Sequence, residues 1–198
     1  QHSQSIHAMF AHVPGLKVVM PSTPYDAKGL MIAAIKDNNP VIFIDERWLY
    51  NETGFVPEEL YSVPIGKAAI RKEGKDITII ASSFLSNQAV KAALLLDKRG
   101  IDAEVIDLRS IKPIDETTIV ESVTKTGRLL VVDGGWRSFG VSAEIAATIS
   151  EKAFDKLKLP IKRLALPDIP APMSRPLENK YYLSYNDIFI EAQKLLET

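Results

Sequence analysis

The amino-acid sequence predicts an α/β protein in which a mainly parallel β-sheet is flanked by helices. First, strand-like and helix-like stretches alternate along most of the 198 residues, as in proteins whose strands are joined by helical crossovers. Second, strand-like stretches such as residues 41–44 (VIFI) are continuous apolar runs, which are typical of strands covered on both faces. Third, Gly100 and Gly127 follow two helical stretches, where left-handed helix caps are expected.

In the first part of the chain we expect a strand, a helix and a second strand, at residues 16–20, 25–37 and 41–44. Thr23 and Pro24 predict the start of the helix, because a hydroxyl caps the first turn and proline fits the first helical position. Pro40 predicts its end, since proline disfavours helical geometry in the residue before it. Residues 51–64 lose periodicity and contain two prolines, so we interpret them as an exposed linker with a domain boundary near residue 64.

Residues 65–198 form the second predicted domain, and residues 1–64 form the first with its linker. The expected strands of the second domain cover residues 68–71, 77–81, 103–107, 129–133 and 161–165. Its expected helices cover residues 86–99, 115–126, 141–156 and 185–197. Residues 165–182 hold four prolines and no regular pattern. We expect this segment to be either a stiff covering loop or a surface that contacts a partner.

The composition excludes several classes of function. The formal net charge is −1 and the basic residues are scattered, so we expect no nucleic acid and no anionic membrane as a partner. The chain has no cysteine, which excludes disulfides, thiolate nucleophiles and thiolate metal sites. No apolar run is as long as a membrane helix. The first residues, QHSQSIHAMF, contain no initiating Met and no signal-peptide pattern, so we interpret the chain as an internal part of a longer protein.

His2 is the first candidate site residue. An imidazole flanked by amides and hydroxyls at the mouth of a helix can exchange protons near neutral pH, and the alternative is a capping or surface histidine. His7 and His12 follow at intervals of five residues. This spacing does not place them on one helical face, so we do not expect a zinc site. Asp45 and Glu46 end a strand but point to opposite faces, so we do not expect an acid–base pair there.

The end of the first helix is a candidate cation site. Free carbonyl oxygens at a helix end, together with the side-chain oxygens of Asp37 and Asn39, suit a hard cation. The alternative is an ordinary helix stop.

The sequence GGWRSFG at residues 134–140 joins a predicted strand to a predicted helix, a layout that can cradle phosphate. Its spacing is not GxGxxG, however, and Asp133 brings a negative charge into the turn. We therefore expect a tight turn that presents an aromatic side chain to a neighbouring domain or subunit.

Several motifs, taken in order, resemble the beta subunits of thiamine diphosphate-dependent 2-oxoacid dehydrogenases over essentially the whole chain. These motifs are QHSQS, AHVPGLKVVMPSTPYDAKGL, AAIKDNNPVIF, AEVIDLRSIKPID and SVTKTGRLLVVDGGWRSFGVSAEIA. The GGWRSFG turn is most similar to the pyruvate enzymes. The resemblance implies a transketolase carboxy-terminal domain at residues 65–198, preceded by the tail of a pyrimidine-binding α/β domain and a linker at residues 1–64.

The resemblance also implies a function, the oxidative decarboxylation of pyruvate with acyl transfer to lipoamide in an α2β2 assembly. The implied partners are an alpha subunit, a second beta subunit and a lipoyl transacylase core, which would dock on the GGWRSFG turn or on residues 165–182. Thiamine diphosphate and Mg would be held mainly by the alpha subunit and by beta-subunit sequence preceding Gln1. The glutamate and the aromatic residue that engage the cofactor ring would lie there too, so we expect no cofactor-binding residue in this chain and no activity from it alone.

Two sets of residues correspond to the family's sites. His2 matches the active-site histidine. A structural potassium loop, which acts mostly through main-chain oxygens, is matched by Ala34, Ile35, Asp37 and Asn39.

Met9 stands where close relatives often carry tryptophan, which leaves the substrate preference open. Acetoin dehydrogenase, branched-chain 2-oxoacid dehydrogenase and split transketolase are alternatives, as is a module that only assembles or docks. The implied location is the cytoplasm in a bacterium, or the mitochondrial matrix or plastid in a eukaryote.

Overall fold

A five-stranded sheet forms the centre of the second part of the chain in the computed structural model, which describes residues 2–197. Its strands lie in the order β3-β5-β4-β7-β8. Their bounds are Ala69–Lys72 (β3), Ile77–Ala81 (β4), Ala103–Asp107 (β5), Leu129–Trp136 (β7) and Lys162–Leu166 (β8). The last four run parallel, and β3 pairs antiparallel with β5 at one edge. The predicted mainly parallel sheet is therefore confirmed.

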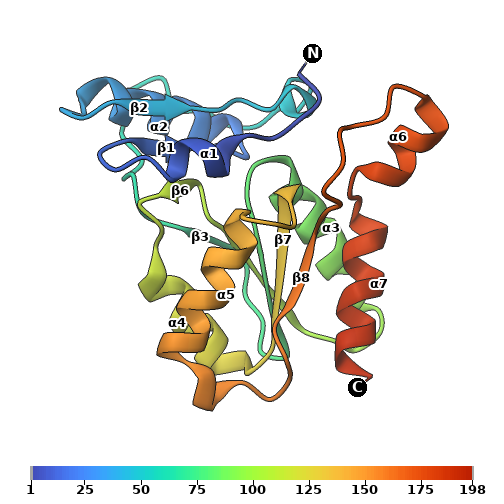
Figure 1. The fold of residues 1–198 in the computed structure, drawn as a ribbon. Helices are drawn as coiled ribbons and strands as arrows, with labels where there is room; N and C mark the ends of the chain where they lie inside the picture. The colour runs from blue at the N-terminus through green and yellow to red at the C-terminus, as the bar shows by residue number, and fades with distance from the viewer. Residues whose placement is uncertain (1, 198) are drawn as a thin grey trace.

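Two pairs of helices cover the two faces of this sheet (Figure 1). One pair comprises α3 (Phe84–Asp97) and α7 (Tyr185–Leu196), and the other comprises α4 (Glu116–Thr126) and α5 (Val141–Lys152). This layering is expected where parallel strands are joined by helical crossovers. Among residues 2–197, no helix combines the length and the apolar character needed to cross a membrane.

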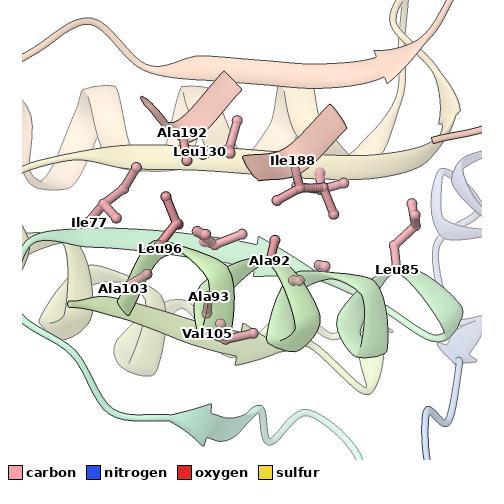
Figure 2. Packing of buried hydrophobic residues seen from close by; sticks show 14 of the residues in the cluster. Ile77, Leu85, Ala92, Ala93, Leu96, Ala103, Val105, Leu130, Ile188 and Ala192 are labelled. Atoms are coloured by element: carbon pink, nitrogen blue, oxygen red, sulfur yellow. The ribbon is translucent and has the colours of Figure 1, made fainter. Parts of the chain in front are cut away.

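Strand β4 is buried on both faces. Ile77 and Ile79 belong to the hydrophobic cluster beneath α3 and α7 (Figure 2), whereas Ile80 belongs to the cluster on the other face. This division follows because successive side chains of a strand point in opposite directions. Thr78 points to the second face, where its hydroxyl lies 2.8 Å from the hydroxyl of Ser122 in α4. Each buried isoleucine contributes roughly 1.5–3 kcal/mol to folding.

The first part of the chain forms a smaller sheet beside the large one. Its elements are α1 (His7–Ala11), β1 (Lys17–Val19), α2 (Pro24–Lys36), β2 (Val41–Phe43) and a 3-10 helix, η1 (Arg47–Leu49). Strand β1 pairs parallel with β2 and antiparallel with β6 (Ser110–Lys112). We did not predict β6, because three residues are too few to give a periodic pattern. Since β6 comes from the second predicted domain, the small sheet joins both sides of the predicted boundary near residue 64.

The connecting segment at residues 51–64 is not wholly exposed, as the sequence had led us to expect. Val63 is 3% exposed, and its N–H donates to the carbonyl of Gly29 at 3.0 Å. Gly29 permits this approach because a Cβ atom there would lie 2.5 Å from Cγ2 of Val63. The start of α2 is as predicted, since the Thr23 hydroxyl accepts from the N–H of Asp26 at 3.1 Å.

The segment at residues 165–182 also differs from the prediction, because it contains the helix α6 (Arg175–Tyr181). Ser174 occupies the N-cap position and Pro176 lies in the first turn, which is a helix start signal that the surrounding prolines obscured. The helix expected at residues 141–156 ends at Lys152, and a 3-10 helix, η2 (Phe154–Lys156), follows it.

Candidate functional site

A cavity of about 610 Å³ lies where the first part of the chain meets the second. Its walls come from the segment before α1, the loop after β2, the start of α3, the turn in β7 and the segment after α6. Its lining includes His2, His7, Glu46, Trp48, Gly134 and Tyr182. The cavity therefore depends on packing between sequence-distant parts of the chain.

His2, the predicted catalytic residue, is exposed and lies on the wall of this cavity. Its φ angle is +57°, in the left-handed region that residues other than glycine seldom adopt. The next residue, Ser3, is held from the other end of the chain, since the Tyr182 hydroxyl donates to its carbonyl oxygen at 2.5 Å. The Tyr182 ring packs edge-on against Trp48, with ring centroids 4.9 Å apart.

His7 lies deeper and forms a buried pair with Asp133, at the point where β7 enters the glycine turn. Nε2 of His7 is 3.1 Å from Oδ1 of Asp133, and the two side chains are 2% and 3% exposed. Asp133 also accepts from the N–H groups of Gly135 at 2.9 Å and Ser142 at 2.8 Å. Burial raises the pKa of Asp133, but the hydrogen bond and charge of His7 and the two backbone donors outweigh it, so the pKa is lowered. The ionised carboxylate accepts a hydrogen bond from each of these partners, so we assign the hydrogen of the His7 ring to Nε2.

Sequence reasoning missed this pair. The local sequence marks Asp133 only as a negative charge in the turn, and the spacing of His7 and His12 does not indicate a metal site. The two residues are 126 positions apart, so no local spacing could have indicated their contact.

The glycines of the GGWRSFG turn leave room for Asp133. A Cβ atom on Gly140 would lie 2.7 Å from Oδ2 of Asp133, and one on Gly135 would lie 3.2 Å from Oδ1. Because Asp133 already takes the N–H of Ser142 in the first turn of α5, a phosphate would meet a carboxylate there. A phosphate at the start of α5 would therefore compete with the buried Asp133 carboxylate for the N–H of Ser142.

Of the two aromatic residues in this turn, only Phe139 is presented outward. Phe139 is 97% exposed and has a φ angle of +58°. The Trp136 indole N–H instead donates to the carbonyl of Ile169 at 3.0 Å, which ties the turn to the segment before α6.

Asp45 and Glu46 both line the cavity but have different partners. Glu46 accepts from the N–H of Phe84 at 3.1 Å, and burial raises the pKa of its carboxyl. Asp45 is exposed and accepts from the Tyr50 hydroxyl at 2.6 Å. Their hydrogen-bond partners differ, but both residues lie after the end of β2 and line the same cavity, so they do not point to opposite faces of a strand as the sequence had indicated.

The predicted potassium loop lies at the end of α2, and none of its four residues lines the cavity. Oδ1 of Asp37 accepts from the backbone N–H of Asn39 at 2.9 Å, and Oδ2 accepts from Nζ of Lys17 at 2.5 Å. The Lys17 hydrogen bond, together with those of Asn39, lowers the pKa of Asp37 to about 2. In the described part of the chain, no three His, Asp or Glu side chains gather as a metal site. A cation at Ala34, Ile35, Asp37 and Asn39 would therefore rely on main-chain oxygens, which a helix end does supply.

Comparisons with known proteins agree with this two-part architecture. Residues 66–188 match the family model "Transketolase, C-terminal domain", and residues 1–53 match "Transketolase, pyrimidine binding domain". Among solved structures, "Split gene transketolase, inactive beta4 tetramer" superposes with a TM-score of 0.82 at 27% identity, covering 96% of this chain and 60% of that chain.

Three curated proteins are similar over nearly the whole chain. The beta subunit of acetoin:2,6-dichlorophenolindophenol oxidoreductase from Bacillus subtilis (strain 168) is 48% identical over 99% of this chain and 57% of its own length. The pyruvate dehydrogenase E1 component subunit beta of Rickettsia felis is 47% identical over 98% of this chain and 59% of its own length. The 2-oxoisovalerate dehydrogenase subunit beta of Bacillus subtilis (strain 168) is 48% identical over 92% of this chain and 56% of its own length. The chain thus spans little more than half the length of these relatives.

Proposed function

Because the chain belongs to the transketolase carboxy-terminal domain family and is homologous to the beta subunits of 2-oxoacid dehydrogenases, we propose that it is part of a pyruvate dehydrogenase beta subunit. The observation that carries the proposal is the position of His2 on the wall of the cavity between the two matched domains. In the intact enzyme this chain would supply one wall of the active site, and an alpha subunit would supply another.

Thiamine diphosphate, when bound, would supply the electron sink for decarboxylation. The residues of this chain do not suit its diphosphate at the β7 turn, because Asp133 already occupies the start of α5. Cofactor and Mg would instead be held mainly by the alpha subunit and by the part of a beta subunit that this chain does not cover. Alone, this chain would therefore have no activity.

His2 would orient the substrate or move a proton at its exposed imidazole. The test is the complete beta subunit assembled with its alpha subunit, with His2→Ala compared against His12→Ala, a second exposed histidine that does not line the cavity. We expect His2→Ala to slow turnover of pyruvate by about a hundredfold or more, with assembly unchanged. Full activity in His2→Ala, or loss of the assembly, would refute the catalytic role.

Acetoin is a second candidate substrate, which the 48% identity to an acetoin enzyme supports. Pyruvate and acetoin can both deliver a two-carbon acetyl unit, but pyruvate releases carbon dioxide and acetoin releases acetaldehyde. Product analysis of the same assembly with each compound separates the two. Carbon dioxide release at the higher kcat/KM favours the pyruvate assignment, and acetaldehyde release favours the acetoin assignment.

Potassium at the end of α2 belongs to the same proposal, with main-chain oxygens of Ala34, Ile35, Asp37 and Asn39 as ligands. The free energy of unfolding should be higher in potassium chloride than in choline chloride of equal ionic strength, by about 1 kcal/mol or more once potassium well exceeds its dissociation constant. Equal ionic strength screens the Lys17–Asp37 pair equally in both salts. No difference between the salts would remove potassium from the proposal.

Docking of the transacylase core and pairing with a second beta subunit would use exposed apolar groups. Phe139 and Met173 are almost fully exposed, on the GGWRSFG turn and on the segment before α6. Phe and Met side chains are enriched in the cores of protein–protein interfaces. Phe139→Ser and Met173→Ser should weaken binding of the core without lowering pyruvate decarboxylation, as titration with the purified core would measure.

A further inference from the structure

The short segment that carries His2 is held at two points by the second part of the chain. At one point the Tyr182 hydroxyl donates to the carbonyl oxygen of Ser3 at 2.5 Å. At the other, His7 pairs with Asp133 at 3.1 Å. Residues 3 to 7 therefore lie between two anchors that come from positions 133 and 182. Between them, the Ser5 hydroxyl lies close to Gly134, 3.6 Å from the position that a Cβ atom there would take.

The anchor at Asp133 is rigid for a physical reason. Its carboxylate is buried and fixed by the N–H groups of Gly135 and Ser142, so it cannot rotate without losing hydrogen bonds. Ser142 lies in the first turn of α5, whose N-terminal N–H groups favour a negative charge. His7 therefore meets a partner whose position is set by the large sheet and by α5.

The anchor at Tyr182 is fixed by aromatic packing. The Tyr182 ring lies edge-on to Trp48 at 4.9 Å and to Tyr181 at 5.1 Å between centroids. Trp48 in turn packs edge-on against Phe84, at the start of α3, with centroids 4.7 Å apart. Such pairs add to the stability given by burial, so the hydroxyl of Tyr182 reaches Ser3 from a well-defined place.

We propose that Tyr182 and the His7–Asp133 pair are positioning residues for His2, and this inference rests on the function proposed above. The left-handed backbone of His2 is a conformation that persists only where its surroundings impose it. The anchors act on the residues that directly follow His2, because Tyr182 holds the carbonyl oxygen of Ser3, the next residue, and Asp133 holds the far end of the segment at His7. Without them, the exposed segment would sample many conformations, and the imidazole would be in the reactive position for a smaller fraction of the time.

The first test uses the chain itself and two neighbouring tyrosines. Tyr182→Phe removes the hydroxyl that holds Ser3, and Tyr181→Phe removes a hydroxyl that donates to the carbonyl of Ile169 at 3.0 Å, away from this segment. We expect the backbone order parameters of residues 3–6, measured by ¹⁵N relaxation, to fall from about 0.85 towards 0.6 in Tyr182→Phe only. Unchanged order parameters in Tyr182→Phe would overturn the proposal.

The second test uses two substitutions of His7. His7→Gln keeps a donor near the position of Nε2, so it should restore the contact with Asp133, whereas His7→Leu keeps the apolar volume and removes the donor. We expect residues 3–6 to stay ordered in the glutamine variant and to become mobile in the leucine variant. Equal mobility in the two variants would mean that the hydrogen bond to Asp133 does not position the segment.

The third test measures turnover in the complete beta subunit assembled with its alpha subunit. Tyr182→Phe should lower kcat roughly tenfold with little change in KM, because misplacing a reactive group slows the chemical step. Tyr181→Phe should behave like the unmodified enzyme. A loss of order without a loss of kcat would overturn the positioning role. Full activity in His2→Ala, by contrast, would defeat the proposed function and leave the order-parameter tests unaffected.

Discussion

Arg71, which is partly exposed, forms an ion pair with the fully buried Asp107 that joins two neighbouring strands of the large sheet. Nη2 of Arg71 lies 2.6 Å from Oδ2 of Asp107, and the same nitrogen also bonds to the carboxylate of Asp26 in α2. Asp26 receives a further bond from Nη1 of Arg109 at 3.0 Å. Asp107 also accepts from the Ser22 hydroxyl at 2.5 Å. These contacts cross from the first part of the chain to the second, so they help to fix the walls of the cavity relative to each other.

Replacing Arg71 by methionine should be strongly destabilising. The substitution leaves Asp26 and Asp107 buried without their shared cation, and breaking a buried pair in this way costs about 3–5 kcal/mol. Arg71→Lys should be intermediate, since an ammonium group does not span two carboxylates as a guanidinium does. Urea unfolding followed by circular dichroism measures the effect, with the exposed Arg99→Met as the control. A loss for Arg71→Met no greater than that for the control would contradict this account of the pair.

Gly140 should not tolerate alanine. A Cβ atom there would lie 2.7 Å from Oδ2 of Asp133 and closer still to the carbonyl oxygen of Trp136. Forcing that contact should cost about 1–3 kcal/mol in thermal or urea unfolding. Gly54→Ala is the matched control, because its nearest neighbours would be atoms of Pro24 at 3.5 Å, an ordinary contact. That control should be neutral, or should stabilise the fold by up to about 1 kcal/mol, because alanine lowers the conformational entropy of the unfolded chain. Equal effects of the two substitutions would show that the space around Gly140, next to Asp133 and Trp136, can accept a Cβ atom.

Two isoleucines of α7 should differ sharply when each is replaced by alanine. Ile188 is fully buried in the cluster beneath α3 and α7 (Figure 2), whereas Ile190 is 45% exposed. We expect Ile188→Ala to cost about 2–5 kcal/mol, because it leaves a cavity. We expect Ile190→Ala to cost no more than about 1 kcal/mol. Both changes remove the same atoms from the same helix. A similar cost for both would therefore contradict the assignment of Ile188 to the buried face of α7 and of Ile190 to the exposed face.

Much of the fold followed from local signals. Strands β4 and β5 begin and end at the predicted residues, 77–81 and 103–107, because each is a short, mainly apolar run bounded by clear breaks. The start of α2 was equally local, because Thr23 supplies a capping hydroxyl and Pro24 fits the first helical position. Strand β6 escaped prediction because its pairing with β1 is a tertiary contact between three-residue segments.

The site was less accessible to sequence reasoning. His2 was singled out by its polar neighbours and by the family resemblance, but its anchors were not. Tyr182 and Ser3 are 179 positions apart, so nothing in either local sequence indicates that they meet. The same holds for Arg71, which reads as an ordinary surface residue of an edge strand until α2 brings Asp26 to it.

Asp133 should make the stability of the chain depend on pH in the acid range. Its pKa is lowered in the folded chain, so the unfolded chain, with a pKa of about 3.9, takes up the proton first as the pH falls. The stabilisation by its contacts is therefore complete above about pH 4, and is lost as the pH falls through the folded pKa. In Asp133→Asn, the fall in unfolding free energy over this range should be shallower than in the unmodified chain. Salt at 0.5 M screens exposed pairs such as Lys156–Asp155 but screens the buried Asp133 much less. The difference between the two chains should therefore persist in that salt. Parallel curves for the two chains would mean that Asp133 is not held ionised by His7 and the turn.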